Sequence, residues 1–357
     1  MSRSLTIFLC CALLAVPSAF AGTSGDLGGA GRSSKAAHAA APSWAQAEIR
    51  YVVRRGLMAK TEATFRANDV LTQGELAGLV AGLTKKSAAV TADPTAAVTV
   101  AQLDARLVRV LALGGAAQAF GDGSRAAGLV TPSRFGTETV ARLLGLRTNH
   151  PARQDDLELL PTEPVTRAET AYSVARILRF RGWEQQSVEE AAATFELPEL
   201  GAWQKRVLNT AVRFIGFPYV WGGTSEKASA PFGVETPGGF DCSGFVWRVY
   251  KLQAYSGGAA LSATIKGRTT YQMSGEVPKA KRVAFVRISP GDVLFFGPAG
   301  PRSRPGSIGH AGIYLGSGWM IHSSGQGVAV TPLTGWYREQ FAWGRRPLAE
   351  AGLPSTR

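Results

Sequence analysis

The chain has 357 residues, a formal net charge of +13 and 45% hydrophobic residues, which suits about two ordinary globular domains. After the first 21 residues no apolar run approaches the roughly 20 residues that a membrane-spanning helix requires, so we expect no membrane span. The positive charge favours a polyanionic partner. Nucleic acid is not expected, because the sequence has no RNP pattern, zinc-finger spacing or basic heptads.

Residues 1–21 have the features of a secretory signal peptide. Arg3 supplies the positive charge, an apolar stretch follows, and residues 19–21 form a small-x-small cleavage site. Residues 22–42 are rich in Gly, Ser and Ala and predict a flexible linker. We therefore expect a secreted protein, whose positive charge favours anionic partners of the cell envelope such as wall polymers or membrane surfaces.

Residues 43–182 predict an all-helical region built from degenerate repeats. Three threonines each stand three residues before Glu or Gln, and each precedes an apolar run with helical spacing. The pairs are Thr72 and Glu75, Thr99 and Gln102, and Thr166 and Glu169. This spacing is typical of a capping box, in which the two side chains bind each other's backbone N–H at a helix start. Residues 183–198 are interpreted as the connection to the next domain.

Residues 199–349 predict an α+β domain, followed by a tail at 350–357. An amphipathic helix near 203–215 and a second helix after residue 242 precede short apolar segments separated by glycine. Those segments lie at 283–288, 292–296, 310–315, 319–322, 328–333 and 341–345. Helices followed by an antiparallel meander are typical of the α+β class.

Cys242 is the one cysteine outside the leader, so it is a buried filler, an intermolecular bridge or a nucleophile. An apolar run with helical spacing follows it, which predicts that Cys242 opens a buried helix. The helix dipole and the free N–H groups of the first turn are expected to stabilise a thiolate there, below the ordinary thiol pKa. We therefore favour the nucleophile.

His310 and His322 are the candidate bases. They lie in two predicted strands joined through Gly316-Ser317-Gly318. A hairpin centred on Gly316 would pair the two histidines directly, with Cβ atoms roughly 4.5–5.5 Å apart. One imidazole would then take the thiol proton while the other orients it. A zinc site is the alternative, although one Cys and two His leave the usual four-ligand set incomplete.

Five motifs in this region resemble the NlpC/P60 family of cell-wall cysteine peptidases. They are residues 218–223 (PYVWGG), 241–245 (DCSGF), 290–296 (PGDVLFF), 309–316 (GHAGIYLG) and 321–323 (IHS), in the family's order. The resemblance implies a papain-like fold and a Cys-His-His triad of Cys242, His310 and His322. It also implies that Tyr219, Asp241 and Ser243 bind the substrate, and that no metal or organic cofactor is required.

The N-terminal region resembles S-layer homology repeats. Residues 44–75 follow that family's order, and residues 165–169 (VTRAE) match its short signature. Gln73 and Val100 stand where the first two units would carry the signature arginine. The resemblance implies attachment to anionic cell-wall polysaccharide, and a helical spacer is the alternative.

The resemblances together imply an exported peptidoglycan hydrolase that cleaves stem peptides at the D-γ-glutamyl–diamino acid bond. One alternative is an N-acetylmuramoyl-L-alanine amidase or an acyl transferase on the same fold. A second is a non-catalytic wall-binding protein.

Overall fold

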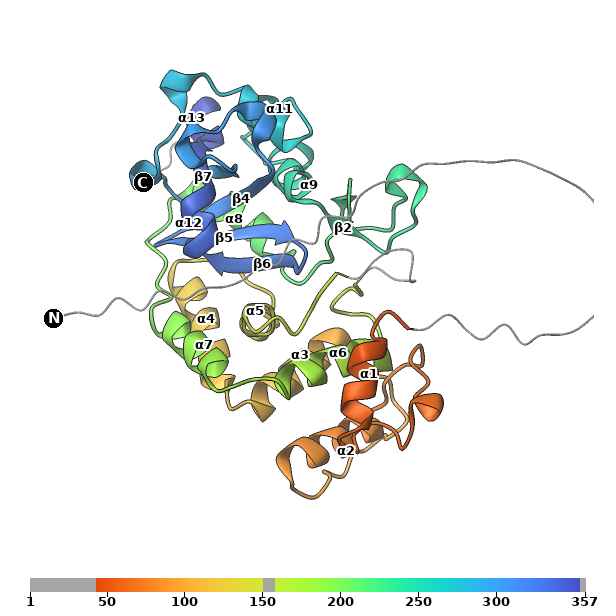
Figure 1. Ribbon diagram of the computed structural model, residues 1–357. Helices are drawn as coiled ribbons and strands as arrows, with labels where there is room; N and C mark the ends of the chain where they lie inside the picture. Colours follow the sequence, from red (N-terminus) through yellow and green to blue (C-terminus); the bar gives the residue numbers. More distant parts are fainter. Residues whose placement is uncertain (1–42, 150–157, 354–357) are drawn as a thin grey trace, which may run out of the picture. The chain divides into compact units, whose positions relative to one another are not determined.

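The computed structural model describes residues 43–149 and 158–353 (Figure 1). The expected signal peptide and linker lie outside these residues. The N-terminal part is helical: its helices are α1 (Gln46–Val53), α2 (Gln73–Thr84), α3 (Val100–Val110), α4 (Gly114–Ala126), α5 (Phe135–Leu143), α6 (Arg167–Ile177) and α7 (Trp183–Ala193). The segment interpreted as a connection thus contains α7, whose Val188 and Ala192 are buried.

The predicted capping boxes mark real helix starts. The side chains of Thr72 and Thr99 each accept from the N–H of the Glu or Gln at N3, and that side chain in turn accepts from the threonine N–H. At α6 the Thr166 hydroxyl accepts from Glu169 N–H at 3.1 Å, while the Glu169 carboxylate lies 3.3 Å from the Arg147 guanidinium.

The three segments that lead into these helices bind one another in a closed ring. Leu71 N–H donates to Val165 O at 2.9 Å, Val165 N–H donates to Val98 O at 2.8 Å, and Val98 N–H donates to Leu71 O at 2.9 Å. All three side chains are fully buried. Each unit donates to one neighbouring unit and accepts from the other at the equivalent position. The three repeats predicted from the threonine spacing are therefore arranged around one three-fold axis.

Arg167, the arginine of the VTRAE signature, holds this arrangement together from within. Its guanidinium donates to the carbonyls of Phe65 (2.7 Å) and Met58 (2.6 Å) and pairs with Glu75. The residue is 3% exposed. A guanidinium bound in this way has little capacity left for an external ligand.

The C-terminal part contains helices and an antiparallel sheet. The helices are α8 (Ala202–Val212), α9 (Cys242–Trp247), α10 (Leu261–Thr264), α11 (Thr270–Gly275), α12 (Gly335–Gln340) and α13 (Pro347–Glu350). The strands are β1 (Thr224–Ser225), β2 (Gly239–Phe240), β3 (Val293–Phe296), β4 (His310–Gly316), β5 (Trp319–Ser324), β6 (Gly327–Pro332) and β7 (Phe341–Arg345). The last five form a sheet in the order β6-β5-β4-β3-β7 with antiparallel neighbours (Figure 1). The α+β prediction is confirmed.

One expected strand is absent from the sheet, and one expected segment end differs from the end of a helix. Residues 283–288 do not form a strand of the sheet: a short 3-10 turn covers Phe285–Arg287, and Val283 makes an isolated bridge to Gly344. The predicted tail begins inside α13, where Glu350 pairs with Arg345 at 2.8 Å.

A buried ionic cluster joins the helical region to the sheet domain. Arg142 of α5 binds Glu138 at 2.7 Å and Glu158 at 2.8 Å, and all three side chains are at most 1% exposed. The same guanidinium donates to Gly216 O, beyond the end of α8, at 2.9 Å. Charges so deeply buried are stable only when paired and hydrogen-bonded, so this cluster fixes α5 against the sheet domain.

Candidate active site

Cys242 is the first residue of α9, as predicted. Asp241 is the N-cap, and its Oδ1 accepts from Gly244 N–H at 2.5 Å. The backbone N–H groups of Ser243 and Ala311 lie near the Cys242 sulfur and act to lower the pKa of its thiol. Ala311 follows His310 on β4, so the start of α9 places the sulfur beside the strand that carries the first histidine.

The expected low thiol pKa is not found. Burial, and then the nearby Asp241 carboxylate, raise the pKa of Cys242 to about 11, while the N–H donors of Ala311 and Ser243 and the Arg268 charge act in the opposite direction. The helix start therefore does not outweigh desolvation of the thiolate. The resting site holds a neutral thiol.

The two histidines meet, although not in the predicted register. Ile313 pairs with Ile321 and Tyr314 with Met320, whereas a hairpin centred on Gly316 would have placed His310 opposite His322. The turn is Ser317-Gly318, with φ of 48° and 81°, and a bulge precedes it. The resulting shift is two residues, and side chains on a strand alternate with period two, so both histidines stay on one face.

Gly312 makes the diagonal contact possible. A Cβ on Gly312 would lie 3.0 Å from the Cβ of His322, so the position opposite His322 carries no side chain. The imidazole of His310, two residues away on the same face, reaches across this gap. Its Nε2 lies 2.9 Å from Nδ1 of His322.

The contacts of the two rings are compatible with the tautomers that a general base at His310 requires. For His310 to accept a proton at Nδ1, its Nε2 must carry hydrogen and donate to His322 Nδ1. His322 then carries hydrogen on Nε2, which lies 3.0 Å from Thr331 Oγ1 on β6. Thr331 thus ends a hydrogen-bonded series that begins at His310. No local sequence pattern points to Thr331, because its contact with His322 depends on pairing between β5 and β6.

Aromatic side chains from α12 and β3 surround the imidazoles. The Tyr337 ring centroid lies 5.1 Å from that of His322, and the Phe296 and Tyr337 centroids lie 5.7 and 6.0 Å from that of His310. Burial lowers the pKa of His310 to about 4 and lowers the pKa of His322 well below its ordinary value. Both rings are therefore neutral at neutral pH.

Of the residues expected to bind substrate, Tyr219 lies within electrostatic range of Cys242. Burial, and then the charges of Cys242 and Asp241, raise the pKa of its phenol far above the usual range. Its hydroxyl is therefore neutral at neutral pH. Tyr219 is held by a bridge to Phe240, directly before the Asp-Cys motif.

Asp241 and Ser243 bind each other and Arg268, a residue that no sequence motif had indicated. Ser243 Oγ donates to Asp241 Oδ1 at 3.0 Å, and Gly222 N–H donates to Asp241 Oδ2 at 2.9 Å. Arg268 donates to both carboxylate oxygens, at 3.1 and 3.0 Å, and to Ser243 Oγ at 2.7 Å. The oxygens of Asp241 are thus occupied within the protein, so Asp241 organises the site and is poorly placed to bind substrate directly.

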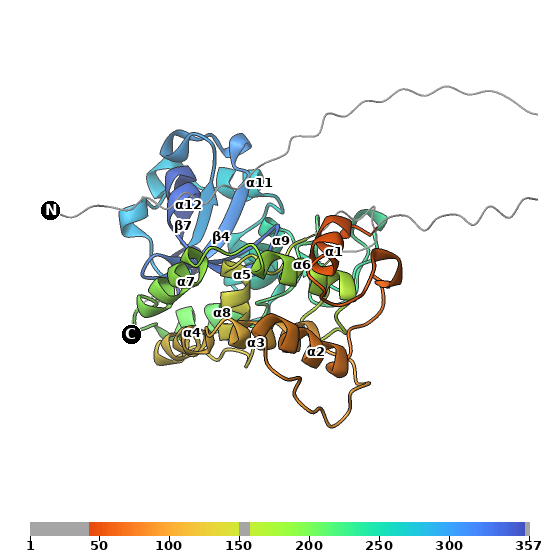
Figure 2. The same cartoon turned by 60° about the horizontal axis from the view of Figure 1, so that its bottom comes forward.

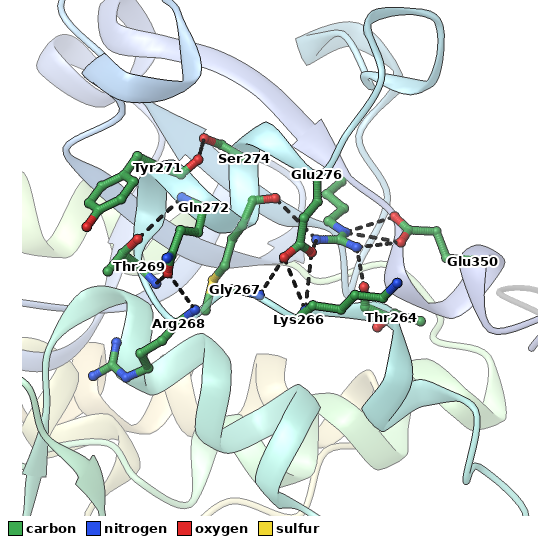
Figure 3. Close-up of polar contacts among 12 residues, drawn as sticks. Thr264, Lys266, Gly267, Arg268, Thr269, Tyr271, Gln272, Ser274, Glu276 and Glu350 are labelled. Atoms are coloured by element: carbon green, nitrogen blue, oxygen red, sulfur yellow. Dashed lines mark hydrogen bonds and ion pairs between the residues drawn. The ribbon is translucent and has the colours of Figure 1, made fainter.

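The loop before α11 is built to hold Arg268 in place (Figure 3). Gln272 Oε1 accepts from the N–H groups of Arg268 and Thr269, at 3.0 and 3.1 Å. Glu276 accepts from Lys266 N–H at 3.2 Å and from Gly267 N–H. Figure 3 shows the Arg268 side chain leaving this loop on the side away from Glu276.

No group of three or more His, Cys, Asp or Glu side chains with metal-binding geometry occurs within residues 43–149 and 158–353. In the same part of the chain, no helix has the length and apolarity needed to cross a bilayer.

Comparison with known proteins assigns both regions. Residues 216–346 match the NlpC/P60 family and residues 39–77 match the S-layer homology domain. The second match covers the first of the three helical units. Both resemblances noted from the motifs are thereby confirmed: the chain carries an NlpC/P60 domain near its C-terminus and an S-layer homology domain in its N-terminal region.

Similar proteins include cell-wall peptidases. The gamma-D-glutamyl-L-lysine dipeptidyl-peptidase of Bacillus subtilis is 33% identical over 129 residues, which are 36% of this chain and 34% of that protein. The probable peptidoglycan endopeptidase LytE of Bacillus subtilis is 33% identical over 132 residues, 37% of this chain and 30% of that protein. A solved NlpC/P60 family protein from Bacillus cereus is 31% identical with a TM-score of 0.31, covering 43% of this chain and 42% of that chain. The chain spans about a third of the length of the curated relatives it matches.

Proposed function

We propose, from the NlpC/P60 domain at residues 216–346, that the chain is a cysteine endopeptidase that cleaves peptidoglycan stem peptides between D-γ-glutamate and the diamino acid. One observation carries the proposal. His310, His322 and Thr331 form a hydrogen-bonded series with contacts of 2.9 and 3.0 Å, and the backbone of Ala311, next to His310, lies near the Cys242 sulfur.

His310 acts as the general base through Nδ1, because its Nε2 is engaged with His322. Burial keeps His310 neutral, so Nδ1 accepts the thiol proton while the Cys242 sulfur attacks the carbonyl carbon. The imidazolium that forms donates from Nε2 to His322, and His322 donates to Thr331. Since thiol and imidazole both start neutral, charge separation develops only during the attack.

Backbone N–H groups at the start of α9 are placed to stabilise the oxyanion. First-turn N–H groups have no acceptor within their own helix. Asp241 takes that of Gly244 and that of Ser243 lies near the sulfur, so the N–H of Cys242 is the candidate donor to the carbonyl oxygen. Such donors are effective because they need no reorganisation as charge develops.

The intermediate then breaks down in two steps. His310 returns its proton to the amide nitrogen, the C–N bond breaks and the diamino acid leaves as an amine, with the acyl group held on Cys242 as a thioester. A water then gives its proton to His310 Nδ1 and attacks the thioester carbon. The C–S bond breaks, the carboxyl product is released and the thiol regains its proton.

The choice of bond and the location are supported by similarity. The relative from Bacillus subtilis is named for cleavage beside a gamma-D-glutamyl group, and S-layer homology domains favour placement at the cell envelope. Anionic wall polysaccharide is then a second partner.

Mass spectrometry of the products from purified muropeptides tests the bond. The proposed cleavage gives a peptide with a diamino acid at its new N-terminus and leaves γ-glutamate at the new C-terminus. An amidase would instead free the amino group of L-alanine. A product with a free L-alanine N-terminus, or turnover equal to wild type in Cys242→Ala, would contradict the proposal.

A further inference from the structure

Trp336 of α12 is an exposed aromatic residue that the proposed mechanism does not use. It is 44% exposed, although its ring centroid lies only 6.4 Å from that of His310 and 5.1 Å from that of Tyr337. Binding sites for small molecules are lined mainly by apolar and aromatic side chains. A large apolar ring that is open to solvent beside the general base is therefore a candidate contact for the substrate.

The indole of Trp336 is held in place by other rings. Phe296 of β3 lies alongside it, with centroids 6.3 Å apart and planes inclined by 28°, and Tyr337 meets it edge to face at 86°. Phe296 is 1% exposed, so its ring is a fixed support. A side chain that is already held in this way loses little conformational freedom when a ligand binds, which favours binding.

The sheet places Trp336 on the far side of His310 from the nucleophile. Side chains alternate between the two faces along β4. Ala311 belongs to the hydrophobic core that includes the buried side chains of α9, whereas His310 shares a face with Phe296, its partner on β3. Figure 2 shows α9 on one side of β4 and α12 on the other. His310 therefore lies between Cys242, at the start of α9, and Trp336.

This order indicates which part of the substrate meets the indole. In the proposed mechanism His310 gives its proton to the leaving amine, so the α-nitrogen of the diamino acid must come within about 3 Å of His310 Nδ1. The acyl group lies on the other side, bound to Cys242. The alkyl side chain of a diamino acid extends several ångströms from its α-carbon, which is comparable with the 6.4 Å between the imidazole and indole centroids.

We infer that Trp336 is a specificity-determining residue that packs against the alkyl side chain of the leaving diamino acid. The inference rests on the proposed peptidase function and adds how the residue after the scissile bond is recognised. Methylene groups placed against an indole are removed from water, which is favourable in proportion to the apolar area buried. The terminal amino group of the side chain can stay in water, as it does when lysine covers an apolar surface.

Two peptides that differ in one side chain test the inference. One is L-Ala-γ-D-Glu-L-Lys, and the other has L-2,4-diaminobutyrate in place of lysine, which keeps the amino group but is two methylene groups shorter. We expect wild type to prefer the lysine peptide about fivefold in kcat/KM, and Trp336→Ala to reduce this preference to less than about twofold. Trp183→Ala removes an indole of similar exposure, 49%, from α7 and should leave the preference unchanged.

The ratio between the two peptides decides the inference, because general damage to the site lowers both kcat/KM values together. An unchanged ratio in Trp336→Ala, or no preference for lysine in wild type, would overturn it. Calorimetric binding of both peptides to Cys242→Ala, with and without Trp336→Ala, gives the same comparison without turnover. If wild type cleaves neither peptide, the proposed function fails, and the binding ratio still decides the role of Trp336: loss of the lysine preference in Trp336→Ala supports it, and equal binding of the two peptides to Cys242→Ala overturns it.

Discussion

Arg268 and Asp241 form a two-point ion pair, with nitrogen–oxygen distances of 3.1 and 3.0 Å. Asp241 also caps the helix that Cys242 opens. A carboxylate beside a cysteine disfavours the thiolate, and the guanidinium offsets that effect. We therefore propose that Arg268 is a positioning residue that makes the Asp241 cap compatible with Cys242 as a nucleophile.

Replacing Arg268 should impair the nucleophile. In Arg268→Gln the offsetting charge is lost, so the thiol pKa rises further and alkylation of Cys242 by iodoacetamide at pH 9 should slow several-fold, with kcat/KM about tenfold lower. Arg268→Lys keeps the charge and should alkylate within about twofold of wild type. Arg248→Gln, which breaks the ion pair with Glu226 in the same domain, is the control for general destabilisation. Equal alkylation rates in Arg268→Gln and wild type would exclude this role.

The hydroxyl oxygen of Thr331 should be required for full activity, because it is the acceptor for His322 Nε2. Thr331→Val has nearly the same shape but leaves the buried Nε2 of His322 without an acceptor, which costs about 1–3 kcal/mol. We expect kcat to fall about tenfold, since 1.4 kcal/mol corresponds to a factor of ten. Thr331→Ser restores the hydroxyl and should recover most of the rate. A Val variant as active as the Ser variant would show that His322 is oriented by other contacts.

The two histidines should tolerate different replacements. His310→Ala should reduce turnover to the level of Cys242→Ala, because residues that act as one unit are not additive. His322 accepts from His310 through Nδ1, and an Asn side-chain oxygen can occupy a similar position. We expect His322→Asn to retain measurable activity and His322→Ala to lose more, as measured by steady-state muropeptide cleavage. Identical losses for Asn and Ala would contradict the orienting role.

The acid limb of kcat/KM should lie near pH 4. Burial lowers the pKa of His310 to about 4, so the base stays neutral down to that pH, whereas an ordinary histidine at pH 5.5 would be only about one-tenth neutral. The stability of the fold should depend on His310 in the same way. Between pH 4 and about 6.5 the unfolded chain binds a proton at this histidine that the folded chain does not bind. The free energy of unfolding therefore decreases, and the fold becomes less stable, as pH falls through this window. Parallel pH–rate and pH–unfolding curves check both statements. An activity midpoint near 6.5 would contradict the assignment.

Local sequence patterns predicted much of the fold. The threonine spacing identified the starts of α2, α3 and α6, and glycine-separated apolar runs identified β3 to β7, because both features arise from neighbouring residues. Cys242 at a helix start and His310 on the same face as His322 followed from the same reasoning. The predicted hairpin register was wrong by two residues. Because this is an even number, both histidines were still placed on the same face of the sheet.

The missed features depend on contacts distant in the sequence. Arg268 reaches Asp241 across 27 residues, and Thr331 meets His322 only after β5 pairs with β6. A local signal existed for the first: Thr269 and Gln272 form a capping box directly after Arg268. The raised pKa of the Cys242 thiol could not be predicted from its position at a helix start, because it results mainly from burial of the thiol in the folded domain.

The central claim, that Cys242 carries the acyl group, is tested most directly by mass spectrometry of enzyme quenched in acid during turnover of purified muropeptides. We expect the peptide that contains Cys242 to gain the mass of the γ-glutamyl acyl fragment, and hydroxylamine to remove it. Cys242→Ala should show neither the added mass nor turnover, while Ser243→Ala should still form the thioester. Cleavage by Cys242→Ala at the wild-type rate, with no adduct on Cys242 in the wild type, would contradict the account.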